Sequence, residues 1–459
     1  MLGTPFAENA LRSQTTLDNA ESTRRASPMR LPKRLLGLTV GAALALAGGP
    51  VAAQDGEPIK VGVLHSLSGT MAISETTLKD TVEMMVSDLN ESGGLLGREV
   101  ETVVVDPASD WDLFAEKARQ LIEVEDVDVV FGCWTSASRK AVLPVFEELD
   151  GLLFYPVQYE GQEASKNIFY TGAAPNQQSI PATKYLLDQG FERFALLGTD
   201  YVFPRTTNKI LDAYLNQNGI SDDDIMVNYT PFGHSDWQSI ISRVKSFANQ
   251  GKRTAIISTI NGDANVPFYK ELANQGVDAL DTPVVAFSVG EQELSGIDTD
   301  PLIGHLAAWN YFMTVETPEN DKFIANFREF TDDEDRVVND PMEAHYIGFN
   351  MWVQAVRQAG TTDVAAVRNA MYGQTVQSLS GFEVAMNENH HLSKPVMIGE
   401  IGPGGQFNIV QKTDEAIPGD PWSDYLPESE NLTADWTYPW VCGGCEEPTF
   451  ADAGLIGVD

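Results

Sequence analysis

From Ile59 onward, short apolar runs alternate with amphipathic segments along the chain. The apolar runs are rich in β-branched residues and predict buried strands at 59–64, 100–106, 127–131 and 152–155. Helical periodicity between them predicts crossover helices at 75–90, 111–124 and 138–149. Strands that alternate with helices of this length are typical of βαβ units in a parallel sheet.

A second series of the same kind follows an irregular stretch at 160–175. Its expected strands lie at 193–198, 225–229, 253–259 and 282–288, and its expected helices at 204–217 and 235–248. The fold class is therefore α/β, with two doubly wound parallel-sheet lobes. Three further helices, at 320–330, 344–358 and 364–372, and a strand at 393–401 could complete either lobe. From Asp414 the chain loses periodicity and predicts an extended tail.

The N-terminus has the features of a secretory signal. Basic residues precede the apolar run 35–47, and the small residues 51–53 predict cleavage after Ala53. The apolar run is short for a membrane anchor, which is the alternative. Met29 is a second candidate start. Residues 1–53 are therefore assigned to signal peptide and leader, and the mature protein is expected in the periplasm.

The formal net charge of −36 makes nucleic acid an implausible partner, because phosphates would be repelled. A surface adapted to high salt explains this charge better than an acidic binding patch. The chain has three cysteines. After a secretory signal, Cys442 and Cys445 in C-G-G-C predict a short disulfide loop, preferred over a redox or zinc site. Cys133 is left unpaired.

Loops that follow parallel strands meet at one edge of a sheet, where open α/β folds bind ligands. Hydroxyls, amides, aromatic rings and a few carboxylates recur in these loops, whereas basic residues do not. Such a lining suits a small, neutral, hydrogen-bonding ligand. The candidate ligand-binding residues are Trp134, Thr135, Ser136, Tyr155, Gln158, Tyr201, Phe203, Thr259, Asn261 and Glu291.

Each candidate also has an interpretation without ligand. Ser136 stands where a helix begins and could be its N-cap. Tyr155 and Tyr201 could be packing aromatics, and Glu291 could be a solvated acid at a helix start.

Enzymatic and metal sites are weakly supported. A Cys133 nucleophile needs a neighbouring base, and only His65 follows a strand of the same lobe. His390 and His391 have no third metal ligand at usable spacing and predict a hairpin loop. No catalytic residue, metal or cofactor is expected.

Several long segments resemble one known family. HSLSGTMAISE, DPASDWDLFAEKA, FGCWTSASRKAVLPVFEELDGLLFYPVQYEGQE, YTGAAPNQQ, GTDYVFPRTTNKI and DWTYPWVCGGC closely resemble the periplasmic urea-binding proteins of ABC transporters. That group belongs to the type I periplasmic-binding superfamily, with the branched-chain amino acid and amide receptors. The likeness runs from about Ile59 to Phe450.

The resemblance implies two lobes joined by a hinge of three crossovers that closes on ligand. Lobe 1 would take 59–172 and 311–375, lobe 2 would take 173–310 and 376–413, and 414–459 would form the C-terminal tail. In related amide receptors the ligand contacts residues that correspond to Trp134, Ser136, Tyr155, Tyr201 and Phe203. Here 157–159 is Val-Gln-Tyr, where branched-chain receptors have small residues and a threonine, which argues against an α-amino acid.

The function predicted from sequence is an extracytoplasmic receptor that captures urea or a short amide and delivers it to an ABC permease at the inner membrane. The alternatives are a periplasmic amide sensor and an amide hydrolase that uses Cys133.

Overall fold

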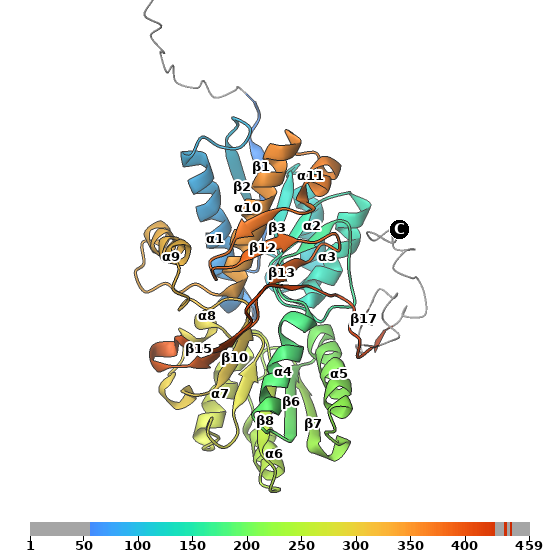
Figure 1. Cartoon of the computed structure of the whole chain (residues 1–459). Coiled ribbons are helices and arrows are strands. Elements are labelled where there is room, and N and C mark those ends of the chain that lie inside the picture. The colour runs from blue at the N-terminus through green and yellow to red at the C-terminus, as the bar shows by residue number, and fades with distance from the viewer. Residues whose placement is uncertain (1–55, 427–435, 438–440, 443–459) are drawn as a thin grey trace, which may run out of the picture. The chain divides into compact units, whose positions relative to one another are not determined.

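The computed structural model describes residues 56–426, 436–437 and 441–442. The predicted signal peptide and the side chains of Cys442 and Cys445 lie outside the described residues. Within the described part of the chain, no helix has the length and hydropathy required to cross a membrane. Figure 1 shows the course of the chain and the labels of its elements.

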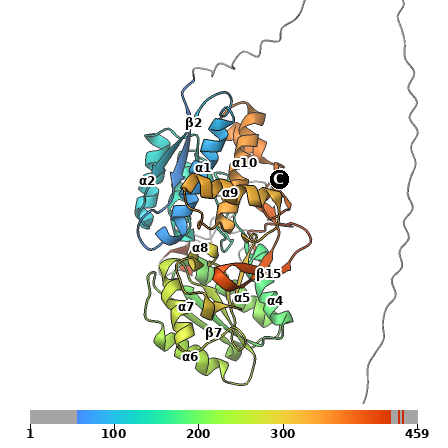
Figure 2. The ribbon, with the colours of Figure 1, turned by 90° about the vertical axis from the view of Figure 1, so that its left-hand side faces the viewer.

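The first lobe is built on a five-stranded parallel sheet of order β2-β1-β3-β4-β5. Its strands are β1 (Ile59–Leu64), β2 (Val100–Val105), β3 (Val129–Gly132), β4 (Leu153–Tyr155) and β5 (Ile168–Tyr170). Its helices are α1 (Ala72–Glu91), α2 (Trp111–Glu123), α3 (Ser136–Glu148), α9 (Pro318–Thr331), α10 (Asp340–Ala359) and α11 (Val364–Met371). Helix α1 packs against α9 and α10, and Figure 2 shows the three together.

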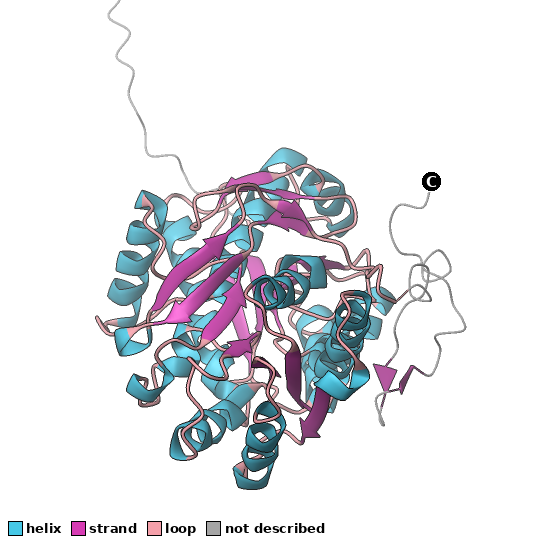
Figure 3. Cartoon of the chain, turned by 60° about the horizontal axis from the view of Figure 1, so that its bottom comes forward, coloured by secondary structure: helices cyan, strands magenta, loops and turns pink. Residues whose placement is uncertain are grey.

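The second lobe is built on a seven-stranded sheet of order β15-β14-β10-β9-β8-β6-β7. Its strands are β6 (Arg193–Thr199), β7 (Ile225–Thr230), β8 (Thr254–Thr259), β9 (Val284–Ala286), β10 (Leu306–Trp309), β14 (Met397–Ile401) and β15 (Phe407–Lys412). Its helices are α4 (Ser179–Asp188), α5 (Val202–Gln217), α6 (Gln238–Ala248), α7 (Asn265–Asn274) and α8 (Glu291–Leu294). Strands β6 to β10 run parallel, whereas β14 is antiparallel to both of its neighbours. Figure 3 shows cyan helices flanking the magenta strands.

The α/β fold class and the parallel sheets confirm the sequence prediction. The prediction of one continuous strand at 393–401 was wrong, because the strand is interrupted after Lys394. Its first part, β13 (Leu392–Lys394), belongs to a small antiparallel sheet with β11 (Thr375–Gln377), β12 (Glu383–Met386) and β16 (Ile417–Pro418). Its second part is β14. Two short strands, β17 (Trp436–Thr437) and β18 (Val441–Cys442), pair with each other. The boundaries predicted for the two lobes stay predictions.

Local sequence explains where the elements begin and end. Helix α10 begins after Asn339, whose side chain accepts a hydrogen bond from the Met342 N–H, and Pro341 occupies the first turn. The helix ends at Gly360, which has a φ of +68°. Strand β6 is buried along its whole length because helices cover both faces of a parallel sheet.

Three segments that run between the lobes lie after β5, after β10 and between β13 and β14, and Asn310 holds these crossings together. Its Nδ2 donates to the carbonyl of Gln177 at 3.0 Å and to that of Pro395 at 2.6 Å. Its backbone N–H donates to Asp340 at 2.8 Å. Lys394, fully buried, donates to the carbonyl of Thr171 at 3.2 Å. The three crossings therefore form one hydrogen-bonded hinge.

Replacing Asn310 by alanine should lower the free energy of unfolding by about 2–4 kcal/mol, because two buried carbonyls lose their donor. Guanidinium chloride unfolding measures this loss without adding urea to the protein. Asn326→Ala removes only a 3.4 Å bond between exposed side chains and should change stability by less than about 0.5 kcal/mol. Equal effects of the two substitutions would contradict the role given to Asn310.

Candidate functional site

The candidate site begins where β3 and β4 end. These strands are paired neighbours, with Phe131 opposite Phe154, so their following loops lie side by side. The Tyr155 hydroxyl donates to the backbone carbonyl of Trp134 at 2.6 Å, which ties one loop to the other. Both side chains are buried. Because its hydroxyl donates to the Trp134 carbonyl, Tyr155 is already engaged as a donor in this structure.

Behind these loops, the guanidinium of Arg139 is completely buried. Its Nε donates to Glu163 at 2.6 Å, its Nη1 to the Ser136 hydroxyl at 3.1 Å, and its Nη2 to Glu160 at 3.4 Å. The rings of Tyr155 and Tyr159 lie 4.7 and 4.6 Å from the guanidinium carbon. Two carboxylates and two aromatic faces thus replace the water that this cation has lost.

The opposite charges of this group stabilise the ionised forms of one another. Burial by itself would lower the pKa of Arg139, but Glu163 and Glu160 hold that pKa well above its usual value. Burial would likewise raise the pKa of Glu163, but Arg139 and Lys140 lower it to about 2. Both groups are therefore ionised at neutral pH, and the guanidinium remains paired.

Ser136 belongs to this charged group and is not the helix cap. The N-cap of α3 is Thr135, whose side chain accepts from the Ser138 N–H, so the interpretation of Ser136 as the cap was wrong. The Ser136 hydroxyl donates to Glu160 at 2.5 Å and accepts from Arg139. Its proton is committed to a carboxylate, which leaves an oxygen lone pair for any further partner.

The second lobe brings Tyr201 and Phe203 to the same region. Both are buried at the start of α5, with their ring centroids 6.2 Å apart. Burial first, and then the neighbouring Tyr155 and Glu160, raise the pKa of Tyr201 well above its usual value. Tyr201 therefore lies within electrostatic range of the first-lobe residues.

Gln158 joins the two lobes directly. Its Nε2 donates at 2.8 Å to the hydroxyl of Ser288, which follows β9 in the second lobe. Its Oε1 is buried and accepts no hydrogen bond from the described residues, and the Trp134 indole N–H likewise has no acceptor among them. One buried donor and one buried acceptor therefore remain open in the loops after neighbouring strands.

The three remaining candidates have partners elsewhere. Thr259 donates to the carbonyl of Leu197 at 3.3 Å, and Asn261 donates to that of Thr259 at 3.0 Å. Glu291 accepts from the Met313 N–H at 2.6 Å, near the second crossing. Among the described residues, no hydrogen bond joins these three to Trp134 or Tyr155. Their roles as ligand contacts stay predictions, as do those of the other seven candidates.

Glu291 is buried at the start of α8. Burial raises its pKa to about 8, although the Met313 N–H opposes the shift. In the unfolded chain this carboxyl ionises near pH 4.5. Unfolding therefore releases its proton between about pH 4.5 and pH 8, and stability falls as pH rises through this range.

Titration of Glu291 should lower the free energy of unfolding by at most about 1.4 kcal/mol for each unit of rising pH. This loss is confined to the range between the unfolded and the folded pKa of Glu291. Glu291→Gln keeps the acceptor for Met313 and removes the titration. Guanidinium chloride unfolding at pH 5, 7 and 9 should show a smaller loss of stability in this variant than in the wild type. Parallel pH profiles would contradict the assignment.

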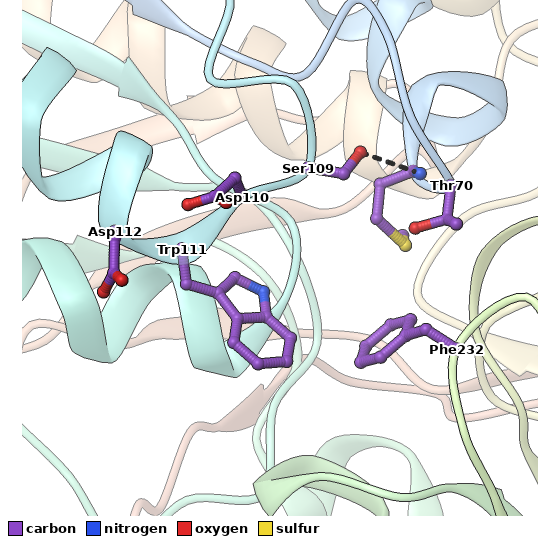
Figure 4. A pocket seen from close by; sticks show the side chains of 7 residues that line it. Thr70, Ser109, Asp110, Trp111, Asp112 and Phe232 are labelled. Carbon is purple, nitrogen blue, oxygen red and sulfur yellow. Dashed lines mark hydrogen bonds between the residues drawn. The ribbon is translucent and has the colours of Figure 1, made fainter.

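A pocket of about 350 Å³ is lined by residues of both lobes. Figure 4 shows Trp111, Ser109 and Thr70 of the first lobe around it, with Phe232 of the second. The rings of Trp111 and Phe232 lie 5.6 Å apart, and Phe232 also contacts Tyr201 at 4.9 Å. None of the ten predicted residues lines this pocket. An aromatic chain instead connects it to the buried Tyr201.

Comparison with known proteins agrees with this architecture. A family model described as "Periplasmic binding protein domain" matches residues 59–428. The chain belongs to this periplasmic binding protein family. A Leu/Ile/Val-binding protein homolog of Brucella melitensis is 23% identical over 411 residues, which cover 84% of this chain and 98% of that relative.

A solved structure also resembles this periplasmic binding protein. It is a solute-binding protein of an ABC transporter from Rhodopseudomonas palustris in complex with p-hydroxybenzoic acid, with a TM-score of 0.70 and 21% identity. The alignment covers 80% of this chain and 99% of that chain. At this identity the likeness shows the fold alone. A protein named limonene hydroxylase from Geobacillus stearothermophilus is 32% identical over 136 residues, which are a quarter of its own length and 29% of this chain.

The local contacts of Cys133 do not support a nucleophile. Burial first, and then the charge of Glu75, raise the pKa of its thiol. His65, the base considered from sequence, uses both ring nitrogens elsewhere: Nε2 lies 2.8 Å from His345 and Nδ1 lies 3.3 Å from Glu75. Burial thus favours the protonated thiol of Cys133, and His65 does not contact it as a base among the described residues.

Cys133 should resist modification in the folded protein. In a Cys442→Ser/Cys445→Ser background, a thiol reagent such as Ellman's reagent at pH 8 should label it only after unfolding in guanidinium chloride. Labelling of the native protein at the rate of a free thiol would contradict its burial and raised pKa.

The two adjacent histidines form a hairpin turn, as predicted from sequence. Strands β12 and β13 pair antiparallel across it, and His390 donates from its backbone to Asn387. Both rings are buried, and that of His391 stacks on Tyr170 with centroids 4.6 Å apart. Among the described residues, no group of three or more His, Cys, Asp or Glu side chains could hold a metal ion.

Proposed function

We propose that this periplasmic binding protein captures urea or a short amide between its lobes and delivers it to an ABC permease at the inner membrane. Membership of the family supports the receptor class and a periplasmic location. The sequence resemblance and the chemistry of the buried loops support the ligand class. Trp134, Ser136, Tyr155, Gln158, Tyr201 and Phe203 are the proposed ligand contacts.

The observation that carries the proposal is that two buried groups in neighbouring loops, the Trp134 N–H and the Gln158 carbonyl oxygen, have no hydrogen-bond partner among the described residues. A buried donor or acceptor without a partner costs free energy, which a ligand with matching groups recovers. Urea and short amides present a carbonyl oxygen for the indole N–H and an N–H for the Gln158 oxygen. Aromatic rings from both lobes suit a small flat molecule.

The charges near these residues favour a neutral ligand. Each nitrogen of the Arg139 guanidinium already donates to a side chain of the protein. A bound carboxylate would therefore lack a free cation and would stand near Glu160, which pairs with Arg139 and Ser136. An amide of the same shape avoids this cost. The relatives named for amino acids, and the one solved with an aromatic acid, share the fold.

Calorimetric titration with urea, acetamide, formamide, leucine and p-hydroxybenzoate tests the proposal. Urea or a short amide should bind with a dissociation constant in the micromolar range, or about −8 kcal/mol. Leucine and p-hydroxybenzoate should bind at least about 100-fold more weakly. Heat from leucine or the aromatic acid, with none from urea or any amide, would refute the proposed ligand class.

Trp134→Phe keeps a flat ring and removes the indole N–H. Because one buried hydrogen bond to the ligand is lost, amide affinity should fall about 5- to 30-fold. Trp237→Phe is the matched control, since its indole donates to the carbonyl of His234 within the second lobe. The control should bind as the wild type does, and equal losses in both variants would argue against the role of Trp134.

A further inference from the structure

Glu160 lies among the proposed ligand contacts, although it is not one of the ten candidate residues predicted from sequence. It is fully buried, and its two oxygens accept from different side chains. One accepts from the Ser136 hydroxyl at 2.5 Å, and the other accepts from Nη2 of Arg139 at 3.4 Å. The charge of Glu160 also acts on Tyr155 and Tyr201, which come from opposite lobes. Glu160 therefore adjoins both halves of the proposed site.

Among the described residues, the buried ion network around Glu160 contains two cations and two anions. Arg139 pairs with Glu160 and Glu163, and Lys140 pairs with Glu163 at 2.6 Å. Arg139, Glu160 and Glu163 are buried, and Lys140 is mostly so. The formal charge of the network is therefore zero, and it offers no excess cation to a ligand that contacts Ser136.

We propose that Glu160 is the residue that makes this receptor select neutral amides over carboxylates of the same shape. The inference rests on the proposed function of the site. Glu160 does so in two ways: it neutralises the guanidinium that would otherwise attract an anion, and it fixes the Ser136 proton toward itself. Ser136 then presents a lone pair, which repels a carboxylate oxygen but accepts an amide N–H.

The proposal concerns the charge of the ligand, so a pair of ligands with the same shape and different charge tests it. Acetamide and acetate have nearly the same shape, and acetate is ionised at pH 7.5. Glu160→Gln keeps the size of the side chain and an oxygen that accepts from Ser136. It removes one negative charge, so that among the described residues of the network Arg139 and Lys140 face one carboxylate and the formal charge of this group rises from 0 to +1. This excess cation would compensate a bound anion.

The experiment measures the affinity of acetamide and of acetate for each variant by calorimetry. The wild type should prefer acetamide by at least about 100-fold, and Glu160→Gln should reduce this preference at least about tenfold through a gain in acetate affinity. Glu148→Gln is the matched control: it removes the same charge from an exposed position on α3. Its preference should equal that of the wild type.

Thermal melts first establish that Glu160→Gln is folded. If it is not, Glu163→Gln makes the same change of charge on the other side of Arg139 and should also gain acetate affinity. An unchanged preference in a folded variant overturns the inference while amide binding by the wild type leaves the proposed function standing. If the wild type binds no amide, the proposed function fails; a gain in acetate affinity in Glu160→Gln then still supports the exclusion of anions by Glu160, and the lack of a gain overturns it.

Discussion

The buried guanidinium of Arg139 is the constraint on which the candidate site depends. A cation removed from water must be paired, and here Glu163 and Glu160 pair with it while Tyr155 and Tyr159 cover its faces. Tyr155 ends β4 and the other three partners lie in the segment after it, whereas Arg139 lies in α3. The network thereby fixes the loops after two neighbouring strands relative to each other and orients the side chains that face the second lobe.

A receptor that closes on a small ligand also needs a defined hinge. Asn310 donates to carbonyls of the first and third crossings and lies itself in the second, while Lys394 reaches the first. These hydrogen bonds lie apart from those of Trp134 and Gln158. The hinge and the proposed ligand contacts thus use separate residues, and the hydrogen bond from Gln158 to Ser288 connects the lobes among the proposed contacts.

Much of the fold was predictable because its signals are local. Eight strands from β1 to β9 follow apolar runs closely, and α2 ends within one residue of its predicted end. The stretch at 160–175 was taken as irregular but contains β5, whose three residues are too few to show a period. The strand predicted at 393–401 proved to be two, because Pro395 lies where the chain leaves one sheet for another.

The sequence by itself indicated the class of fold and the candidate loops, since these depend on hydrophobic period and on residue type at strand ends, and the likeness of its long segments to known receptors indicated the superfamily. It could not show which groups in those loops are already satisfied. The hydroxyls of Ser136 and Tyr155 could each donate to a ligand, but tertiary contacts use both protons, whereas the Trp134 N–H and the Gln158 oxygen have no partner among the described residues. Hydrogen-bond partners and buried charge pairs join residues distant along the chain, so only the folded structure decides them.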